Sequence, residues 1–263
     1  MHNLIKNCEI EYTKSFSTYI DEVNIIRFRD NNIPDMYYHN FTLIKDILTD
    51  EALNDLIIEE KKLERHENKG YIQLESNFSI NDKAFCSDEI KPTISKYYYM
   101  SIPTSHHRFL KAKEQCDVKE AITDEIMKDG IRVDILANSA AMGEEFATKR
   151  IHRKVQIYNS SEDLRFFVCY NNGTPVGNCE LFIKDNVAKI EDFDILEKYQ
   201  RNGFGTAVLK HLLQQAEQLG AEIAYVVTDS EDTAQDMYVK CGFTLIGEKF
   251  PIFFDLTKKT LLF

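Results

Sequence analysis

Motifs for metal binding, disulfide pairing and membrane insertion are missing from this chain of 263 residues. Its six cysteines include no Cys-x-x-Cys pair and no Cys/His spacing of a metal site, so we expect reduced thiols and no bound metal. His106 and His107 are adjacent and would point to opposite faces of a strand, which argues against a shared metal ion. No stretch is apolar over the roughly 20 residues that a transmembrane helix needs. These absences predict a soluble, metal-free globular protein.

Positive charge is scarce, because 32 Lys and Arg stand against 43 Asp and Glu and the formal net charge is −11. Proteins that bind nucleic acid or anionic membranes without sequence specificity rely on Lys and Arg, so neither partner is expected. A cationic small molecule would be attracted instead. Residues 1–9 contain no basic segment that leads into an apolar run, which favours a cytoplasmic location.

Residues 1–114 predict an α/β domain of unknown role. Short β-branched and aromatic runs surround one amphipathic helix, which should begin near Thr49 and end near Gly70. The tyrosine runs at 37–38 and 97–99 are interpreted as strand packing rather than as platforms for bases or sugars, because no basic residues alternate with them. No catalytic arrangement is recognisable in this half.

Residues 115–263 predict a second domain of mixed α/β type. After a short strand, a helix should open at Thr123, and Gly130 inside it predicts a break or two shorter helices. The next helix, over 142–157, carries a basic cluster at 149–154, which we interpret as a solvated face, with an anionic ligand or partner as the alternative. A hairpin and a strand over 189–196 should follow.

A glycine-containing turn joins that strand to a strongly amphipathic helix. Its sequence is Gln200-Arg201-Asn202-Gly203-Phe204-Gly205-Thr206. Glycines let the backbone approach a ligand, and the start of a helix offers unpaired N–H groups and a positive dipole end, so the turn predicts a phosphate site. A Rossmann or P-loop site is disfavoured, because the third glycine and the Gly-Lys-Ser/Thr sequence are absent and the preceding strands form hairpins.

A second motif follows about thirty residues later, after a nearly wholly apolar strand over 223–227. Ala234, Tyr238 and Gly242-Phe243 match the pattern A-x-x-x-Y-x-x-x-G-F, while the turn at 200–205 matches (Gln/Arg)-x-x-Gly-x-(Gly/Ala). Together with the order of elements, these motifs resemble the GNAT superfamily of N-acetyltransferases. The resemblance implies a C-terminal GNAT fold over 115–263, with a mixed, mostly antiparallel sheet and flanking helices. Residues 1–114 would be a degenerate GNAT-like repeat or an unrelated appendage.

The resemblance also implies acetyl-CoA as a co-substrate. Acetyl-CoA would lie where the strand at 189–196 splays from the strand at 223–227, with its pyrophosphate on the turn. Glu231 stands where the family often has a CoA-contacting Asn, so this contact departs from the pattern. The implied cofactor positions are Phe193, Ile195, Gln200, Arg201, Asn202, Gly203, Gly205, Thr206 and Glu231.

The implied reaction is direct acetyl transfer to a primary amine in a ternary complex. A carboxylate must take the proton of the amine, and Glu191 or Asp192 is favoured, with Asp194 and Glu180 as further candidates. Strict alternation would separate Glu191 from the two aspartates, but a β-bulge, expected in the family, would reset it. A backbone N–H near Ile195 would bind the oxyanion. Tyr238 would protonate the departing CoA thiolate.

The acceptor is left open as a small-molecule amine or a protein amine, and the chain as a monomer or a homodimer. The alternative function is that of a non-catalytic acyl-CoA-binding regulator or sensor. A carboxylate and Tyr238 that both face the thioester would favour the enzyme.

Overall fold

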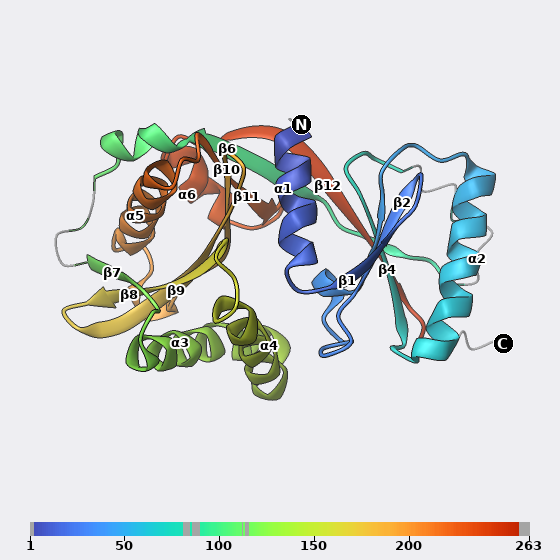
Figure 1. Cartoon of the computed structure of the whole chain (residues 1–263), viewed down its shortest axis with the longest axis horizontal. Helices are drawn as coiled ribbons and strands as arrows, with labels where there is room; N and C mark the ends of the chain where they lie inside the picture. Colours follow the sequence, from blue (N-terminus) through green and yellow to red (C-terminus); the bar gives the residue numbers. More distant parts are fainter. Residues whose placement is uncertain (1–2, 81–84, 86–89, 112, 114–115, 258–263) are drawn as a thin grey trace. The chain divides into compact units, whose positions relative to one another are not determined.

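The computed structural model describes residues 3–80, 85, 90–111, 113 and 116–257. Contacts group these residues into two compact units, each of which is described by itself here (Figure 1). The first unit is built from residues within Met1–Ser15 and Tyr99–Ile246, and the second from residues within Phe16–Tyr98 and Gly247–Phe263. The domain boundary between residues 114 and 115 stays a prediction. In the structure, helix α1 (Asn3–Lys14) and the described residues of 99–113 group with the first unit.

The first unit has a mixed, mostly antiparallel sheet in the order β6-β11-β10-β9-β8-β7. Strands β7 to β10 pair antiparallel, whereas β10 and β11 pair parallel. This sheet confirms the expected mixed, mostly antiparallel arrangement. The bounds are β6 (Tyr97–Pro103), β7 (Cys116–Glu120), β8 (Leu164–Asn171), β9 (Thr174–Lys184), β10 (Val187–Ile195) and β11 (Ile223–Asp229).

Helices cover both faces of this sheet. On one face, α3 (Asp124–Met142) and α4 (Glu144–Tyr158) pack against Phe166, Val168 and Tyr170 of β8. The alternate residue Phe167 meets His211 of α5, so α5 lies on the opposite face (Figure 1). The remaining bounds are α5 (Phe204–Gln218), α6 (Ala234–Lys240) and the short 3₁₀ helices η3 (Thr104–Phe109) and η4 (Glu197–Tyr199).

Helix α3 is continuous through Gly130, so the break expected there is wrong. Gly130 is buried against the sheet, and a Cβ at this position would lie 2.3 Å from Cε1 of Phe166. The missing side chain therefore lets α3 approach β8 closely. Tertiary packing outweighs the low helix propensity of glycine, which costs only about 1 kcal/mol relative to alanine.

The second unit repeats the connectivity of the first. Three antiparallel strands, one helix and a parallel strand occur as β1-β2-β3-α2-β4 in the second unit and as β8-β9-β10-α5-β11 in the first. This shared order agrees with the expected GNAT-like repeat. The bounds are β1 (Thr18–Asp21), β2 (Ile25–Arg29), η1 (Tyr37–His39), β3 (Thr42–Ile44), α2 (Asp50–Glu67), β4 (Tyr71–Ser76), β5 (Thr93–Ile94) and β12 (Thr244–Asp255).

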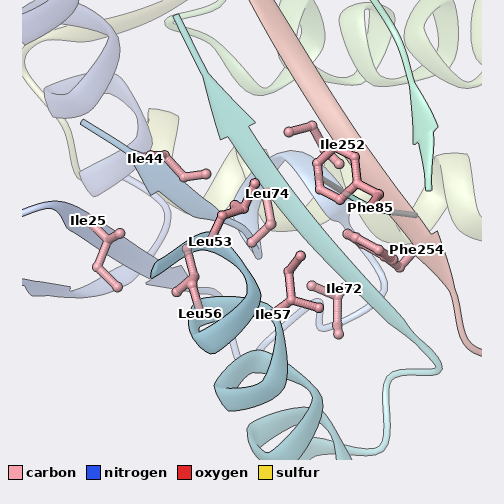
Figure 2. Close-up of a cluster of buried hydrophobic side chains, with 10 residues drawn as sticks. All are labelled: Ile25, Ile44, Leu53, Leu56, Ile57, Ile72, Leu74, Phe85, Ile252 and Phe254. Carbon is pink, nitrogen blue, oxygen red and sulfur yellow. The ribbon is translucent and has the colours of Figure 1, made fainter. Parts of the chain in front are cut away.

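The core of the second unit lies between α2 and its sheet. Leu53, Leu56 and Ile57 of α2 pack on Leu74 of β4 and Phe254 of β12 (Figure 2). The side chain of Thr49 accepts a hydrogen bond from the N–H of Ala52 at 3.2 Å, as expected for an N-cap.

Among the helices that the structure describes, none combines the length and the apolar character needed to cross a membrane. Within the same residues, the His, Cys, Asp and Glu side chains form no group of three or more that could hold a metal ion.

Candidate active site

Strands β10 and β11 separate in the middle of the sheet of the first unit. Their parallel register covers Val187–Lys189 opposite Ile223–Tyr225, while β10 continues to Ile195 and β11 to Asp229. After Lys189, the register that pairs β10 with β11 ends. The separation occurs where the resemblance places the cofactor, beside Phe193 and Ile195.

A β-bulge interrupts β10 at the same place. Glu191 lies opposite Glu180 of β9 and Asp194 opposite Asn178, so Asp192 and Phe193 together face one residue of β9. Asp192 has a positive φ of 45°, and its carbonyl accepts a hydrogen bond from Nδ2 of Asn178 at 3.3 Å. The bulge expected from the resemblance is therefore present.

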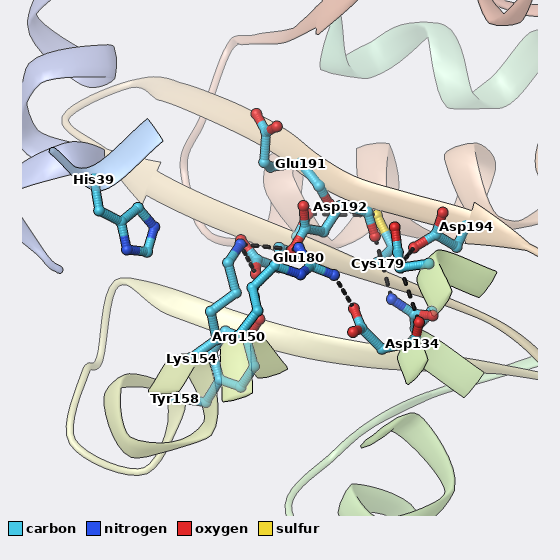
Figure 3. Close-up of polar contacts among 12 residues, drawn as sticks. His39, Asp134, Arg150, Lys154, Tyr158, Cys179, Glu180, Glu191, Asp192 and Asp194 are labelled. Carbon is cyan, nitrogen blue, oxygen red and sulfur yellow. Dashed lines mark hydrogen bonds and ion pairs between the residues drawn. The ribbon is translucent and has the colours of Figure 1, made fainter. Parts of the chain in front are cut away.

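Glu191 and Asp192 have different surroundings, although they are adjacent. Glu191 pairs with Lys189 at 2.9 Å, and burial, opposed by Lys189, raises the pKa of its carboxyl. Asp192 accepts from both Arg150 and Lys154 at 2.6 Å. Burial disfavours the ionised form of Asp192, but the two cations outweigh it and hold the pKa of this carboxyl well below its usual range. Figure 3 shows Glu191 pointing away from this cluster and Asp192 pointing into it.

Asp194 and Glu180 occupy the same face of the sheet as Asp192. Asp194 accepts a hydrogen bond from Nδ2 of Asn138 at 3.0 Å, and burial raises the pKa of its carboxyl. Glu180 is fully buried and accepts from Lys154 at 2.7 Å, from Tyr12 at 2.7 Å and from Tyr158. Three donors thus hold the carboxylate of Glu180 in place.

Arg150 and Lys154 of α4 lie in the interior, with relative exposures of 4% and 2%. The interpretation of the basic cluster as a wholly solvated face is wrong for these two residues, because carboxylates of the sheet and of α3 surround them (Figure 3). Asp134 of α3 pairs with Arg150 at 2.6 Å, and burial raises the pKa of Asp134 to about 7. The spacing of 150, 154 and 158 on one helix face is the sequence signal that could have revealed this buried stripe.

The glycine turn ends in a helix N-terminus without a side-chain cap. Gly203 is the N-cap residue of α5, with a φ of 82°, and no side-chain hydrogen bond caps the helix. The amide of Gln200 donates to the carbonyl of Ile195 at 2.9 Å, and that of Asn202 donates to the carbonyl of Gln200 at 2.9 Å. Gln200 and Asn202 therefore shape the turn through their side chains. The first N–H groups of α5 are left for an anion.

Gly205, Thr206 and Glu231 complete the set of expected cofactor positions. A Cβ on Gly205 would lie 2.6 Å from Sδ of Met237, so this glycine makes room for α6. The hydroxyl of Thr206 contacts Sγ of Cys241 at 3.8 Å. Glu231 is exposed in the β11–α6 loop, where its N–H donates to Asp229 at 2.9 Å.

Tyr238 of α6 is 7% exposed and packs against Phe243 with ring centroids 5.4 Å apart. Burial raises the pKa of its phenol, and the nearby Cys179 and Glu191 add to the shift. This electrostatic influence links Tyr238 to the active-site strand. The charge of Glu191 thus acts on the phenol of Tyr238.

In the second unit, the corresponding junction between β3 and α2 differs from the glycine turn in its helix cap, its charge and its strand pairing. Thr49 caps α2 with its side chain, and Asp50 and Glu51 place negative charge in the first turn. Strand β3 (Thr42–Ile44) pairs with β4 over its whole length. A capped, acidic helix start beside unseparated strands disfavours phosphate binding. Among the residues that the structure describes, the uncapped helix start, the bulge and the separated strands occur together in the first unit only.

Comparison with known proteins agrees with this geometry. Residues 135–243 match the acetyltransferase (GNAT) family. The chain is 28% identical over 229 residues to an uncharacterized N-acetyltransferase, CgeE, of Bacillus subtilis (strain 168), covering 82% of this chain and 84% of that one. Among solved structures, a conserved protein of unknown function from Staphylococcus epidermidis aligns with a TM-score of 0.80 at 22% identity, covering 91% of this chain and 94% of that one.

A second solved structure has the same fold at lower identity. A GCN5-related N-acetyltransferase from Kribbella flavida aligns with a TM-score of 0.73 at 13% identity, covering 98% of this chain and 96% of that one. The matched family residues contain both sequence motifs, the separated strands and the uncapped helix start. The chain therefore carries an acetyltransferase domain of the GNAT superfamily at residues 135–243, in its C-terminal half.

Proposed function

We propose that this acetyltransferase transfers an acetyl group from acetyl-CoA to a primary amine by direct attack within a ternary complex. The observation that carries the proposal is the separation of β10 from β11 beside the uncapped start of α5. The pantetheine arm would pair with the backbone near Phe193 and Ile195, and the pyrophosphate would accept from the first N–H groups of α5. Arg201 would add positive charge at the rim.

Glu191 is the preferred general base. A base must be free to take a proton, and its pKa must lie near the working pH. Burial raises the pKa of Glu191, whereas Arg150 and Lys154 lower that of Asp192. The side chain of Glu191 is also 29% exposed, so an amine or a bridging water can reach it. Asp192 is better suited to holding the bulge in place.

The bulge and Tyr238 would serve the two remaining steps. As the amine nitrogen attacks the thioester carbon, the carbonyl oxygen becomes an oxyanion, and a backbone N–H near Ile195 would stabilise it. Collapse of the intermediate breaks the C–S bond and releases CoA thiolate. A phenol is already protonated at neutral pH, and burial raises the pKa of Tyr238 further, so this residue would carry the proton that it donates to the sulfur.

The acceptor is proposed to be a cationic small-molecule amine, with a protein amine as the other candidate. The chain has a net charge of −11, which attracts cations over long range.

Acetyl-CoA is expected to raise the melting temperature of the protein by about 5 °C at 100 times its dissociation constant, because binding to the folded state alone adds about 2.7 kcal/mol. Acetyl-pantetheine, which lacks the pyrophosphate, should give a much smaller shift at the same concentration. Differential scanning fluorimetry measures both. Equal shifts for the two compounds would contradict the placement of the pyrophosphate at α5. Thiol release from acetyl-CoA across a panel of amines then tests transfer, and binding without release on any amine would favour the sensor.

Tyr238→Phe is expected to lower kcat by about 10²-fold with a small change in KM, because the variant keeps the ring and loses only the proton donor. Tyr170→Phe is the matched control, since Tyr170 is also buried in the first unit but donates to Asp129 at 3.0 Å on α3. Thiol-release kinetics compare the two variants. An unchanged kcat in Tyr238→Phe would refute the assignment of the general acid.

A further inference from the structure

The first helix of the chain lies against the active-site strand. In α1, Glu9 and Tyr12 face β9, β10 and β11 of the first unit, about 180 residues away in sequence. Oε2 of Glu9 accepts from Nζ of Lys189 at 2.6 Å and from the hydroxyl of Tyr225 at 2.9 Å. Two donors from adjacent strands thus fix the carboxylate of Glu9.

Lys189 is shared between two carboxylates. Its Nζ lies 2.6 Å from Oε2 of Glu9 and 2.9 Å from Oε2 of Glu191. Lys189 is 3% exposed, and Nζ lies 4.3 Å from the ring centroid of Tyr12 and 5.8 Å from that of Tyr225. The ammonium is therefore held in one place by α1 and β11. Because it pairs with Glu9 as well, its charge only partly offsets that of Glu191.

We propose that Glu9 is a positioning residue for catalysis: it holds Lys189 and keeps this ammonium from fully neutralising Glu191, so that Glu191 can take the proton of the acceptor amine. The inference rests on the proposed function, in which Glu191 is the general base. It assigns to α1 a role in the acetyltransferase site, although the family match begins at residue 135.

The charges around Glu191 determine whether its pKa rises or falls when the charge of Glu9 is removed. Arg150 and Lys154 are paired with Asp134, Glu180 and Asp192, which leaves Lys189 as the close cation. Glu9 and Asp192 raise the pKa of Glu191, whereas Lys189 lowers it. Without the charge of Glu9, Lys189 would act on Glu191 alone and the pKa of Glu191 would fall. The ionisable groups that pair with Glu191 across the sheet or interact with it electrostatically are Lys189 and Asp192 from β10, Glu9 and Tyr12 from α1, Cys179 and Glu180 from β9, and Tyr238 from α6.

The test compares Glu9→Gln with wild type in the full chain. The acid limb of the pH profile of kcat/KM should move down by about 1 pH unit, and the plateau should fall several-fold because a weaker base accepts the proton less readily. Glu11→Gln is the matched control, since Glu11 pairs with Lys14 on the outer side of the same helix and should leave the limb unmoved. Glu9→Asp keeps the charge and should restore most of the wild-type profile. A purely structural role would lower activity without moving the limb.

A second readout separates this inference from the proposed function. In protein labelled with ¹³C at the glutamate side-chain carboxyl, the signal that is lost in Glu191→Gln reports Glu191, and its titration gives the pKa directly. A lower pKa in Glu9→Gln, with an unchanged circular dichroism spectrum, supports the role of Glu9, and the same pKa in both proteins overturns it. If wild type transfers acetyl to no amine, the proposed reaction fails while the titration still decides the effect of Glu9. If Glu9→Gln does not fold, Glu9→Met removes the same charge and is titrated in the same way, where a lower pKa of Glu191 supports the role and an unchanged pKa overturns it.

Discussion

Glu191→Gln is expected to lower kcat for acetyl transfer by about 10²- to 10⁴-fold, because an amide cannot take the proton of the attacking amine. KM for acetyl-CoA should change little, since the carboxyl of Glu191 lies outside the turn that we propose to hold the pyrophosphate. Steady-state thiol release at saturating acetyl-CoA measures the effect. In wild type, activity should be lost as the pH falls through the raised pKa of Glu191, because protonation removes the base. The variant should lack this acid limb.

Two further variants make the Glu191 result decisive. Glu197→Gln removes an exposed carboxylate from η4, six residues along the chain, and should leave kcat unchanged. Asp192→Asn should lower both stability and activity, since Asp192 pairs with Arg150 and Lys154. Full activity in Glu191→Gln, together with a lost acid limb in a folded Asp192→Asn protein, would transfer the role of the base to Asp192.

Arg150→Met is expected to destabilise the protein by about 3–5 kcal/mol, because removing one partner of a buried ion pair leaves the other charge unpaired. Here two carboxylates lose their partner, those of Asp134 and Asp192, and Asp134 is fully buried. Lys149→Met, which changes an exposed neighbour on the same helix, should stay within about 0.5 kcal/mol of wild type. Urea unfolding monitored by circular dichroism gives both values.

The decrease in the free energy of unfolding caused by Arg150→Met should be larger at pH 8 than at pH 5. In wild type, the pKa of Asp134 is raised to about 7, above its unfolded value, so its ionisation opposes folding as the pH rises toward 7. Arg150 limits this penalty, and without it the pKa of Asp134 would rise further. The lowered pKa of Asp192 acts in the opposite sense, since its stabilisation is present above the unfolded pKa and is lost as the pH falls. An equal loss at pH 5 and pH 8 would show that packing, rather than charge, accounts for the effect.

The two units share one connectivity but differ where the helix after the third antiparallel strand begins. Both contain three antiparallel strands, a helix and a parallel strand. The helix of the first unit starts at Gly203 without a side-chain cap, whereas that of the second starts at Thr49 with a cap and two acids. Such local features decide whether a helix start attracts or repels a phosphate.

The sequence by itself determined those parts of the protein that depend on neighbours close along the chain. The turn at 200–206, the motif from Ala234 to Phe243 and the alternating strands were readable because turn chemistry and periodicity are local properties. The same locality explains the error at Gly130: helix propensity predicts a break there, but the close approach of Phe166 from β8 gives the glycine its role.

Only the tertiary structure decided what each charged residue does. Asp192 and Arg150 are 42 residues apart, and Lys189 and Glu9 are 180 apart, so no local pattern could pair them. The balance between burial and these pairings then sets the pKa of each carboxyl: two cations outweigh burial at Asp192, whereas burial outweighs Lys189 at Glu191. The sequence alone therefore left four candidates for the proposed base, Glu191, Asp192 and Asp194 on one strand and Glu180 on its neighbour. The fold separated Glu191 from Asp192 by directing one toward Lys189 and the other toward Arg150 and Lys154.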